Sequence, residues 1–394
     1  MNPLFQQLMA DATRSTRGGR LGEATEAIQR ALRGVAAQAL AAASAAAAGA
    51  PAAFRGAPGP AVDPTVLDGL VREVPEPNGA GEAHVAPRPA GTAPREGSGE
   101  RWQAGSFSHQ NRTLAYRLYL PPEAPGDGAP RPMVVMLHGC TQHAEDFATG
   151  TRMNALAREL GVVVLYPEQA QRANAHKCWN WFKPQHQQRG RGEPAVIAAL
   201  ARSIATAHRV DPQRVYVAGL SAGGAMADVV GHCYPDVFAA VGVHSGLPYG
   251  CAADVASALS AMRSGPGPAP GTTAGARSTA LPTIVFHGDA DSTVHVRNAE
   301  SLVAALRSGS GEGVASGAEA APRVTRGQSG RGARHTRTVY TDAAGRDTLE
   351  YWQLHGAGHT WSGGSASGSY TDPSGVDASA EMLRFFLSRP RAAR

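Results

Sequence analysis

From about residue 101 onward, short apolar runs alternate with longer amphipathic segments, and this alternation constrains the fold more than any other feature. The apolar runs are continuous and rich in β-branched residues, which is typical of strands that are buried on both faces. They cover residues 133–137, 162–167, 214–220, 239–246 and 283–288. The segments between them have helical spacing, so the order β-α-β-α predicts an α/β fold in which helices flank a mostly parallel sheet.

The chain divides into three parts by composition. Residues 1–35 carry an apolar stripe at helical spacing, which predicts an N-terminal helical segment. Residues 36–100 are rich in Ala, Pro and Gly and have no period, as expected of a flexible linker. Residues 101–390 carry the alternating pattern and are expected to form one domain with a single large core. Two low-complexity insertions in this domain, 263–280 and 307–337, are expected to be surface loops.

The basic excess of the chain lies in segments that we expect to be flexible. The 37 Lys and Arg residues against 32 Asp and Glu residues give a net charge of +5. Arginines gather in the second insertion and in the last residues of the chain; they are Arg323, Arg326, Arg331, Arg334, Arg337, Arg389, Arg391 and Arg394. A basic loop and tail need no docking face, so we expect no nucleic-acid partner. No run of about 18 strongly apolar residues is present, so we expect no transmembrane segment.

The cysteines and the first residues bear on the compartment. Four cysteines, Cys140, Cys178, Cys233 and Cys251, are too few for a disulfide framework in a chain of 394 residues and have no zinc-site spacing, so they allow two bridges, one or none. The opening MNPLFQQLMADATRSTRGG lacks the basic and apolar regions of a secretory signal. We therefore expect a cytoplasmic protein.

One pentapeptide fits a catalytic nucleophile. Ser221 lies in Gly219-Leu220-Ser221-Ala222-Gly223, directly after the strand-like RVYVA and before the helix-like AGGAMADVVGHC. A sharp turn from strand to helix exposes the serine Oγ, and the flanking glycines admit the strained backbone. The same pattern could mark an ordinary helix start, but the strand before it and the helix after it favour a nucleophile.

A serine nucleophile needs a histidine to take its proton and a carboxylate to hold that histidine in the correct tautomer. In this arrangement the chain order is Ser, acid, His. TIVFHGDADSTV offers Asp289 and Asp291, and LHGAGHTW offers His355 and His359. We prefer Asp291, because a carboxylate deeper in the loop can curl toward the histidine while Asp289 caps the turn. We prefer His359, because the preceding Gly-Ala-Gly lets the loop carry an imidazole over Ser221.

The oxyanion that forms on the substrate needs hydrogen-bond donors that are already in place. One is the N–H of Ala222, the residue after the nucleophile. The other is expected to be the N–H of Cys140, because the strand MVVML ends at His138-Gly139 and the following turn faces the same cleft. The His138 side chain is expected to orient this turn. Such a site requires neither a metal ion nor an organic cofactor.

Eight ordered motifs carry a family resemblance. They are LHGCTQ, YPEQ, CWNWF, RGRGEP, RVYVAGLSAGGAMA, HSGLPYG, HGDADSTV and GHTWSGG. In this order they resemble the catalytic domain of the polyhydroxybutyrate depolymerase family of esterases, over about residues 105–388. The resemblance implies an α/β-hydrolase fold and hydrolysis of poly(3-hydroxybutyrate) or its oligomers through an acyl-enzyme. It places the triad on Ser221, Asp291 and His359.

Three departures from the family qualify this expectation. We expect no polymer-binding domain after the catalytic domain and no secretion signal before it, as in intracellular members that act on storage granules or soluble oligomers. The third departure is WSGG where the family usually has Trp-Pro-Gly-Gly. We therefore expect a granule-associated cytoplasmic protein, with an extracellular location, as for secreted members, as the alternative. The apolar stripe of residues 1–35 would contact the granule, or else pack on the main domain or on a second copy of the chain.

Three tryptophans are candidates for substrate binding: Trp179 and Trp181 in CWNWF, and Trp361 in GHTWSGG. Aromatic rings could line an apolar cleft, although burial in the core would explain them equally well. Cys140 and Cys178 occur together in the family's motifs, so the resemblance implies a disulfide that braces the oxyanion turn. Two other functions fit less well, namely a feruloyl or acetylxylan-type carbohydrate esterase and a granule-coat protein without activity.

Overall fold

The computed structural model describes residues 99–123, 129–267, 281–309, 321–342 and 344–391. Its strands are β1 (Arg101–His109), β2 (Arg112–Leu120), β3 (Arg131–Leu137), β4 (Val163–Glu168), β5 (Val210–Leu220), β6 (Ala240–His244), β7 (Thr283–Gly288), β8 (Arg323–Gln328), β9 (Arg334–Thr341), β10 (Asp347–Leu354), β11 (Trp361–Ser362) and β12 (Thr371–Asp372). Its helices are α3 (Ala144–Thr151), α4 (Met153–Leu160), the 3₁₀ turn η2 (Pro184–His186), α5 (Gly192–Ala207), α6 (Ala222–Cys233), α7 (Val255–Ser264), α8 (Arg297–Gly309) and α9 (Ala378–Leu387). The N-terminal helical segment and almost all of the linker expected from the sequence lie outside the described residues.

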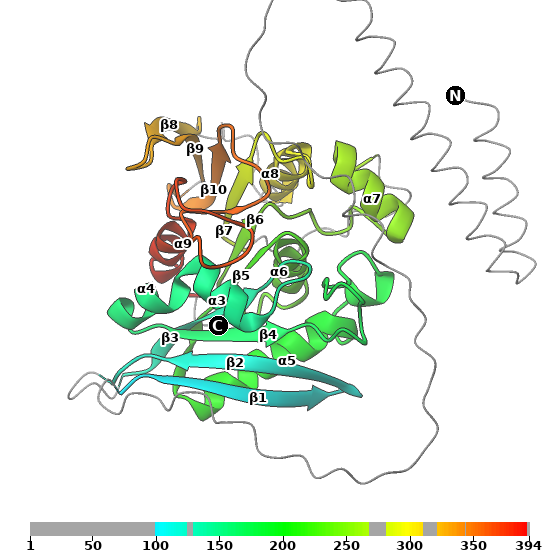
Figure 1. Ribbon diagram of the computed structural model, residues 1–394, viewed down its shortest axis with the longest axis vertical. Coiled ribbons are helices and arrows are strands. Elements are labelled where there is room, and N and C mark those ends of the chain that lie inside the picture. The colour runs from blue at the N-terminus through cyan, green and yellow to red at the C-terminus, as the bar shows by residue number, and fades with distance from the viewer. Residues whose placement is uncertain (1–98, 124–128, 268–280, 310–320, 343, 392–394) are drawn as a thin grey trace, which may run out of the picture. The chain divides into compact units, whose positions relative to one another are not determined.

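Ten strands form one sheet in the order β1-β2-β4-β3-β5-β6-β7-β10-β9-β8 (Figure 1). The six central strands, from β4 to β10 in this order, are mutually parallel. Antiparallel pairs extend both edges of the sheet. The expected α/β fold with a mostly parallel sheet is therefore confirmed. Since parallel strands end at the same edge, the loops after β5, β7 and β10 meet there.

Helices cover both faces of the sheet (Figure 1). Successive side chains of a strand point to opposite faces, so Val135 of β3 joins one apolar core and its neighbours Val134 and Met136 join the other. The first core takes side chains from α5, α6, α7 and α8. The second takes side chains from α3, α4 and α9. The continuous apolar runs of the central strands follow from this burial on both faces.

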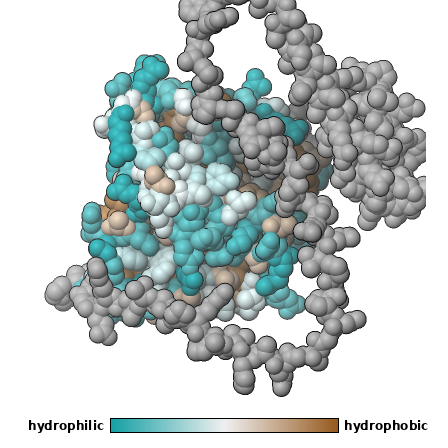
Figure 2. Space-filling model, viewed as in Figure 1, coloured by the Kyte–Doolittle hydropathy of each residue, from teal (hydrophilic) through white to brown (hydrophobic). Residues whose placement is uncertain are grey.

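Polar and neutral side chains make up most of the described surface on the face in Figure 2. Figure 2 shows a largely hydrophilic face on which apolar patches are small and separate. Exposed large hydrophobic side chains of the described residues are Trp102, Leu160, Val255, Leu259, Val324 and Tyr370. Among the helices that the structure describes, none combines the length and the apolar character needed to cross a membrane.

The expectation that residues 307–337 form a surface loop is wrong for residues 321–337, while residues 310–320 lie outside the described part of the chain. Within this range, β8 and β9 form an antiparallel hairpin that pairs with β10 and ends the sheet. Five of the arginines that we assigned to a flexible loop lie on this hairpin or in its turn. Nearly every residue of β8 is exposed. Its sequence therefore lacks the apolar pattern by which a strand can be predicted. Charged side chains suit such an edge, because they discourage pairing with another chain.

Candidate active site

Ser221 lies in the turn between β5 and α6, at the edge where the parallel strands end. Its backbone angles, φ 57° and ψ −121°, are strained for a residue with a side chain. The flanking glycines make the turn possible, because a Cβ atom at Gly223 would collide with the carbonyl group of Leu137 and one at Gly219 would collide with Gly223. The structure thus has the turn from strand to helix that the G-x-S-x-G motif predicts.

Asp291 and His359 meet above the same edge, from the loops after β7 and β10. The Nδ1 atom of His359 lies 2.7 Å from Asp291 Oδ2. The other carboxylate oxygen accepts hydrogen bonds from the backbone N–H groups of Thr293 and Val294 at 2.9 and 2.8 Å. The Asp291 side chain is fully buried, while that of His359 keeps 12% of its surface exposed. Because an ionised carboxylate can only accept, Nδ1 carries the proton and Nε2 is left as the basic nitrogen.

The surroundings of Asp291 keep it ionised. Burial acts to raise the pKa of Asp291, but the hydrogen bond from His359, the charge of that histidine and the amide of Val294 outweigh burial and hold the pKa below its ordinary value. A carboxylate that stays charged can fix the imidazole in one tautomer and stabilise it when it gains a proton. The pair therefore has the geometry and the charge of the acid and base that a serine nucleophile needs.

The two residues that we ranked second, Asp289 and His355, are paired with each other. His355 Nδ1 lies 2.8 Å from Asp289 Oδ2, and His355 Nε2 lies 2.8 Å from Thr336 Oγ1. Both ring nitrogens are thus engaged away from Ser221. Asp289 also accepts the N–H of Gly356 at 2.6 Å, so this second pair ties the loop after β7 to the loop that carries His359. Sequence reasoning did not foresee this bracing role.

Ser221 and His359 are brought to the same edge, but no hydrogen bond joins their side chains in the described structure. Catalytic hydrogen bonds are often long in enzymes without substrate and tighten when substrate binds. His244 lies next to both residues. Its carbonyl accepts the N–H of Ser221 at 2.9 Å, and its imidazole is close enough to His359 for the two charges to interact. Burial first, and the neighbouring histidines second, lower the pKa of His244 to about 3.

Neutral His244 also accepts a backbone hydrogen bond from the serine of WSGG. The N–H of Ser362 donates to His244 Nε2 at 3.1 Å, and Ser362 is buried. A proline, which the family usually has here, lacks this N–H. The departure from the family's motif therefore adds a hydrogen bond beneath the site.

The turn after β3 borders Ser221, as expected for an oxyanion hole. A Cβ atom at Gly139 would lie 3.7 Å from the Cβ atom of Ser221. The N–H groups of Cys140 and Ala222 find no acceptor among the residues that the structure describes, so both remain available to a substrate oxygen. His138 has the expected orienting place, because its ring contacts Gly139 O at 2.7 Å and it is buried. Burial lowers the pKa of His138 to about 4, so the ring is neutral at physiological pH.

The tryptophans do not line a cleft. The exposed fractions of Trp179, Trp181 and Trp361 are 0%, 5% and 1%. Trp179 Nε1 donates to the carbonyl of His138 at 3.1 Å, and Trp361 Nε1 donates to Ser379 Oγ at 3.1 Å. The expectation of substrate contact is wrong for Trp179 and Trp361, whose rings are enclosed by the core, and Trp181 offers almost no surface. Aromatic residues in motifs near the site act here as packing beneath it.

The disulfide that the resemblance implied is present between Cys140 and Cys178. Cys233 and Cys251 are free thiols, and burial raises the pKa of each to about 12, so they stay protonated. Among the described residues, no group of three or more His, Cys, Asp or Glu side chains is placed to hold a metal ion.

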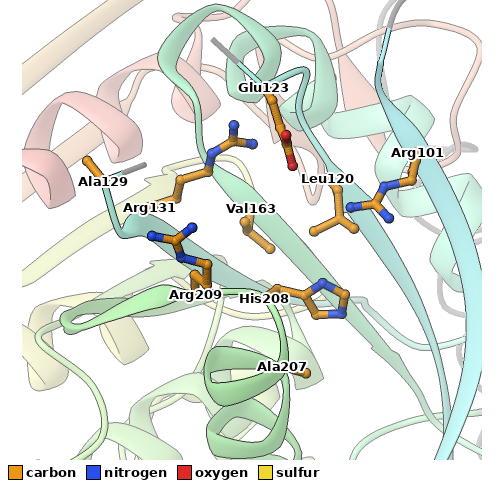
Figure 3. A pocket seen from close by; sticks show the side chains of 9 residues that line it. All are labelled: Arg101, Leu120, Glu123, Ala129, Arg131, Val163, Ala207, His208 and Arg209. Carbon is orange, nitrogen blue, oxygen red and sulfur yellow. The ribbon is translucent and has the colours of Figure 1, made fainter. Parts of the chain in front are cut away.

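A basic pocket of about 210 Å³ lies at another edge of the sheet, and Figure 3 shows the side chains that line it. Arg101, Arg131 and Val163 line it, and they are the first residues of β1, β3 and β4. This is the edge where parallel strands begin, whereas Ser221, next to β5, lies where they end. The pocket is therefore separate from the candidate active site.

Comparison with known proteins agrees with this architecture. An acetyl xylan esterase from Aspergillus awamori superposes with a TM-score of 0.56 at 18% identity, covering 73% of this chain and 99% of that chain. The fold is that of the α/β-hydrolases.

The family follows from the sequence match. Residues 114–328 match the family described as Esterase PHB depolymerase, and the chain belongs to this family. Poly(3-hydroxyalkanoate) depolymerase C of Paucimonas lemoignei is 32% identical over 266 residues, which cover 65% of this chain and 61% of the relative. Feruloyl esterase B of Thermothelomyces thermophilus is 34% identical over 153 residues, which cover 39% of this chain and 50% of the relative. The chain thus spans only about three fifths of the depolymerase it matches.

Proposed function

We propose that the protein is a serine esterase that hydrolyses ester bonds of poly(3-hydroxybutyrate) or its oligomers, with Ser221, His359 and Asp291 as its triad. The observation that carries this proposal is the buried pair of His359 and Asp291, joined at 2.7 Å, at the same sheet edge as the strained serine. His359 Nε2 has no hydrogen-bond partner among the described residues, so it is left to take a proton. The family match and the depolymerase relative support a polyester as the substrate.

The reaction would proceed in two halves. His359 Nε2 takes the proton of Ser221 as Oγ attacks the ester carbonyl carbon, and the N–H groups of Cys140 and Ala222 bind the oxyanion. The tetrahedral intermediate then breaks the C–O bond of the ester, and His359 returns the proton to the departing hydroxyl group. Water that gives its proton to His359 next attacks the acyl-enzyme and releases a 3-hydroxy acid from Ser221. Asp291 stabilises the imidazolium in both halves.

The first test uses a simple ester. Wild-type protein should hydrolyse p-nitrophenyl butyrate, and Ser221→Ala should lose this activity while its thermal unfolding stays unchanged. Substantial turnover by the alanine variant would contradict the assignment of the nucleophile. Labelling of wild-type protein by a fluorophosphonate probe separates an enzyme from a granule-coat protein, since only an activated serine reacts.

A second test identifies the substrate. The carbohydrate esterase alternative rests on the feruloyl esterase relative. Product analysis should be run side by side on amorphous poly(3-hydroxybutyrate) granules, hydroxybutyrate trimers, methyl ferulate and acetylated xylan. Hydroxybutyrate products at the highest kcat/KM would support our proposal. A preference for ferulate or acetyl groups would move the assignment to a carbohydrate esterase.

The place of action is also a proposal. Contact with a storage granule would use residues 1–35, which lie outside the described residues. A cytoplasmic granule is one setting, and an extracellular polymer is the other. The disulfide of Cys140 and Cys178 supports the extracellular setting, because disulfides persist in oxidising compartments. Counting free thiols in protein isolated under alkylating conditions from the source cells tests this point directly.

A further inference from the structure

A buried carboxylate outside the triad, Glu193, lies at the centre of a hydrogen-bond network behind the oxyanion turn. We propose that Glu193 is a positioning residue for the oxyanion hole, because it fixes the segment that holds the turn carrying the N–H of Cys140. This inference rests on the proposed function, in which that N–H binds the oxyanion. It gives a role to the motifs YPEQ, CWNWF and RGRGEP, which the triad leaves without one.

The contacts of Glu193 are all with donors. Its side chain is 1% exposed and lies in the first turn of α5. One carboxylate oxygen accepts the backbone N–H of Asn180 at 2.7 Å and lies 3.2 Å from His186 Nδ1. The other accepts the side-chain amides of Gln169 and Asn180 at 2.7 and 2.6 Å. Three N–H donors and the His186 ring thus converge on one carboxylate from three separate stretches of chain.

Glu193 is ionised in this setting. Burial acts to raise the pKa of Glu193, but the hydrogen bonds and charge of His186 and the amides of Asn180 and Gln169 outweigh it, so the pKa lies below its ordinary value. Hydrogen bonds to a charged acceptor are about twice as strong as neutral ones. The positive end of the α5 helix dipole adds to the preference for a negative charge. The network therefore resists deformation more than a neutral amide in the same place would.

The residues that Glu193 holds are in turn bonded to the oxyanion turn. Gln169 donates its backbone N–H to His138 Nε2 at 3.1 Å and its side-chain amide to the carbonyl of Cys178 at 3.1 Å. Next to Asn180 in the chain, Trp179 Nε1 donates to the carbonyl of His138 at 3.1 Å. These hydrogen bonds hold the ring and the carbonyl group of His138, at the start of the turn, and the carbonyl group of Cys178.

Two further links close the frame. The disulfide joins Cys178 to Cys140 itself. The N–H of Thr141, the next residue, donates to the carbonyl of His176 at 2.7 Å. Residues 138–141 are thus tied to the segment 169–180 by hydrogen bonds and a disulfide, and Glu193 holds this segment at Gln169 and Asn180. Misplacing a catalytic group by about 1 Å can lower the rate about 100-fold. A less rigid frame would displace the N–H of Cys140 and so slow the reaction.

Glu193→Gln is the central test. Glutamine keeps the shape, but its NH₂ group must face at least one of the N–H donors from Gln169 and Asn180, so the frame loosens. We expect kcat for p-nitrophenyl butyrate to fall about 10- to 100-fold while KM changes less than about twofold, because the oxyanion forms only after substrate binds. The rate of Ser221 modification by diethyl p-nitrophenyl phosphate, which also places charge on an oxygen in this hole, should fall in parallel.

Glu350→Gln is the matched control. Glu350 is also a fully buried carboxylate with charged hydrogen-bond partners, Arg337 and Arg384, but it lies on β10 away from the oxyanion turn. The two variants should lose thermal stability to a similar degree, and only Glu193→Gln should lose kcat. Equal losses of kcat in both variants would contradict the proposal, because they would show that Glu193 affects the rate only through the general stability of the fold.

A second variant keeps the test decisive if Glu193→Gln does not fold. Gln169→Met preserves volume and removes the amide that links Glu193 to the Cys178 carbonyl, so kcat should fall at unchanged KM here too. Normal kcat in a folded Glu193→Gln or Gln169→Met protein would overturn the proposal. Failure of the proposed function would look different, since wild-type protein would then show no turnover that depends on Ser221.

Discussion

Changing Asp291 to Asn should lower kcat by about 10⁴-fold, which corresponds to about 5.4 kcal/mol of transition-state stabilisation. The structure shows why the loss should be this large for a change of one atom. Asp291 Oδ1 accepts the N–H groups of Thr293 and Val294, so the asparagine must keep its carbonyl oxygen on that side. Its NH₂ group then faces His359 Nδ1, where the aspartate oxygen lies at 2.7 Å.

The consequence is the wrong tautomer of the catalytic base. Faced with a donor, His359 Nδ1 must accept, and its proton moves to Nε2. An imidazole that carries its proton on Nε2 cannot take the proton of Ser221. Since the two backbone hydrogen bonds are retained, the fold should persist, and thermal unfolding of the variant should lie close to that of the wild type.

Asp289→Asn is the control, because Asp289 lies two residues away and also pairs with a histidine. Its partner His355 has both ring nitrogens engaged, one of them by Thr336. We therefore expect kcat within about tenfold of the wild type. Initial rates with p-nitrophenyl butyrate at neutral pH measure both variants. A kcat for Asp291→Asn above about a tenth of the wild-type value, or an equal fall for Asp289→Asn, would refute the assignment of the acid.

Three further changes test the frame of the site. Gly223→Ala should lower the free energy of unfolding by about 3 kcal/mol or more, measured in urea, because its Cβ would collide with backbone. Changing Cys140 and Cys178 to Ser should cost up to about 4 kcal/mol in the same assay, since the disulfide closes a loop of 38 residues. Lowering the pH from about 8 to about 5 should lower the free energy of unfolding by about 2 kcal/mol for each of His138 and His244. Their pKa values in the folded protein, about 4 and about 3, lie below the ordinary 6.5. The histidines of the unfolded chain therefore bind protons in this pH range while those of the folded protein do not. A flat urea midpoint over this range would contradict the burial of neutral rings.

The central strands were predictable because their burial leaves a strong signal. Strands β3 to β7 are covered on both faces, and a strand in that position must be apolar along its whole length. The runs at 133–137 and 283–288 have this character and lie within β3 and β7. The hairpin of β8 and β9 has the opposite character, since water covers most of β8. Backbone hydrogen bonds join β8 to β9 and β9 to β10. Amino-acid composition does not reveal such bonds.

The nucleophile turn was predictable for a similar reason. Only glycine fits at Gly219 and Gly223, so the motif records a packing constraint. The choice between Asp289 and Asp291 was harder, because both follow β7 within four residues. The structure separates them by depth, since Asp291 is fully buried beside His359 while Asp289 is about a third exposed beside His355. How deeply a loop residue is buried depends on the loops that pack against it. A local sequence pattern does not contain this information.

The tryptophans and Glu193 show why motif residues are easily assigned to substrate. Trp179 and Glu193 belong to motifs that resemble those of an esterase family, yet both side chains are enclosed. A site on loops needs backing that holds its backbone N–H groups in place, and buried groups with satisfied hydrogen bonds supply it. Trp179 holds His138, and Glu193 holds the segment on which Trp179 lies. In the proposed mechanism few residues meet the ester, and the buried residues Gln169, Trp179 and Glu193 hold the oxyanion turn in place from behind.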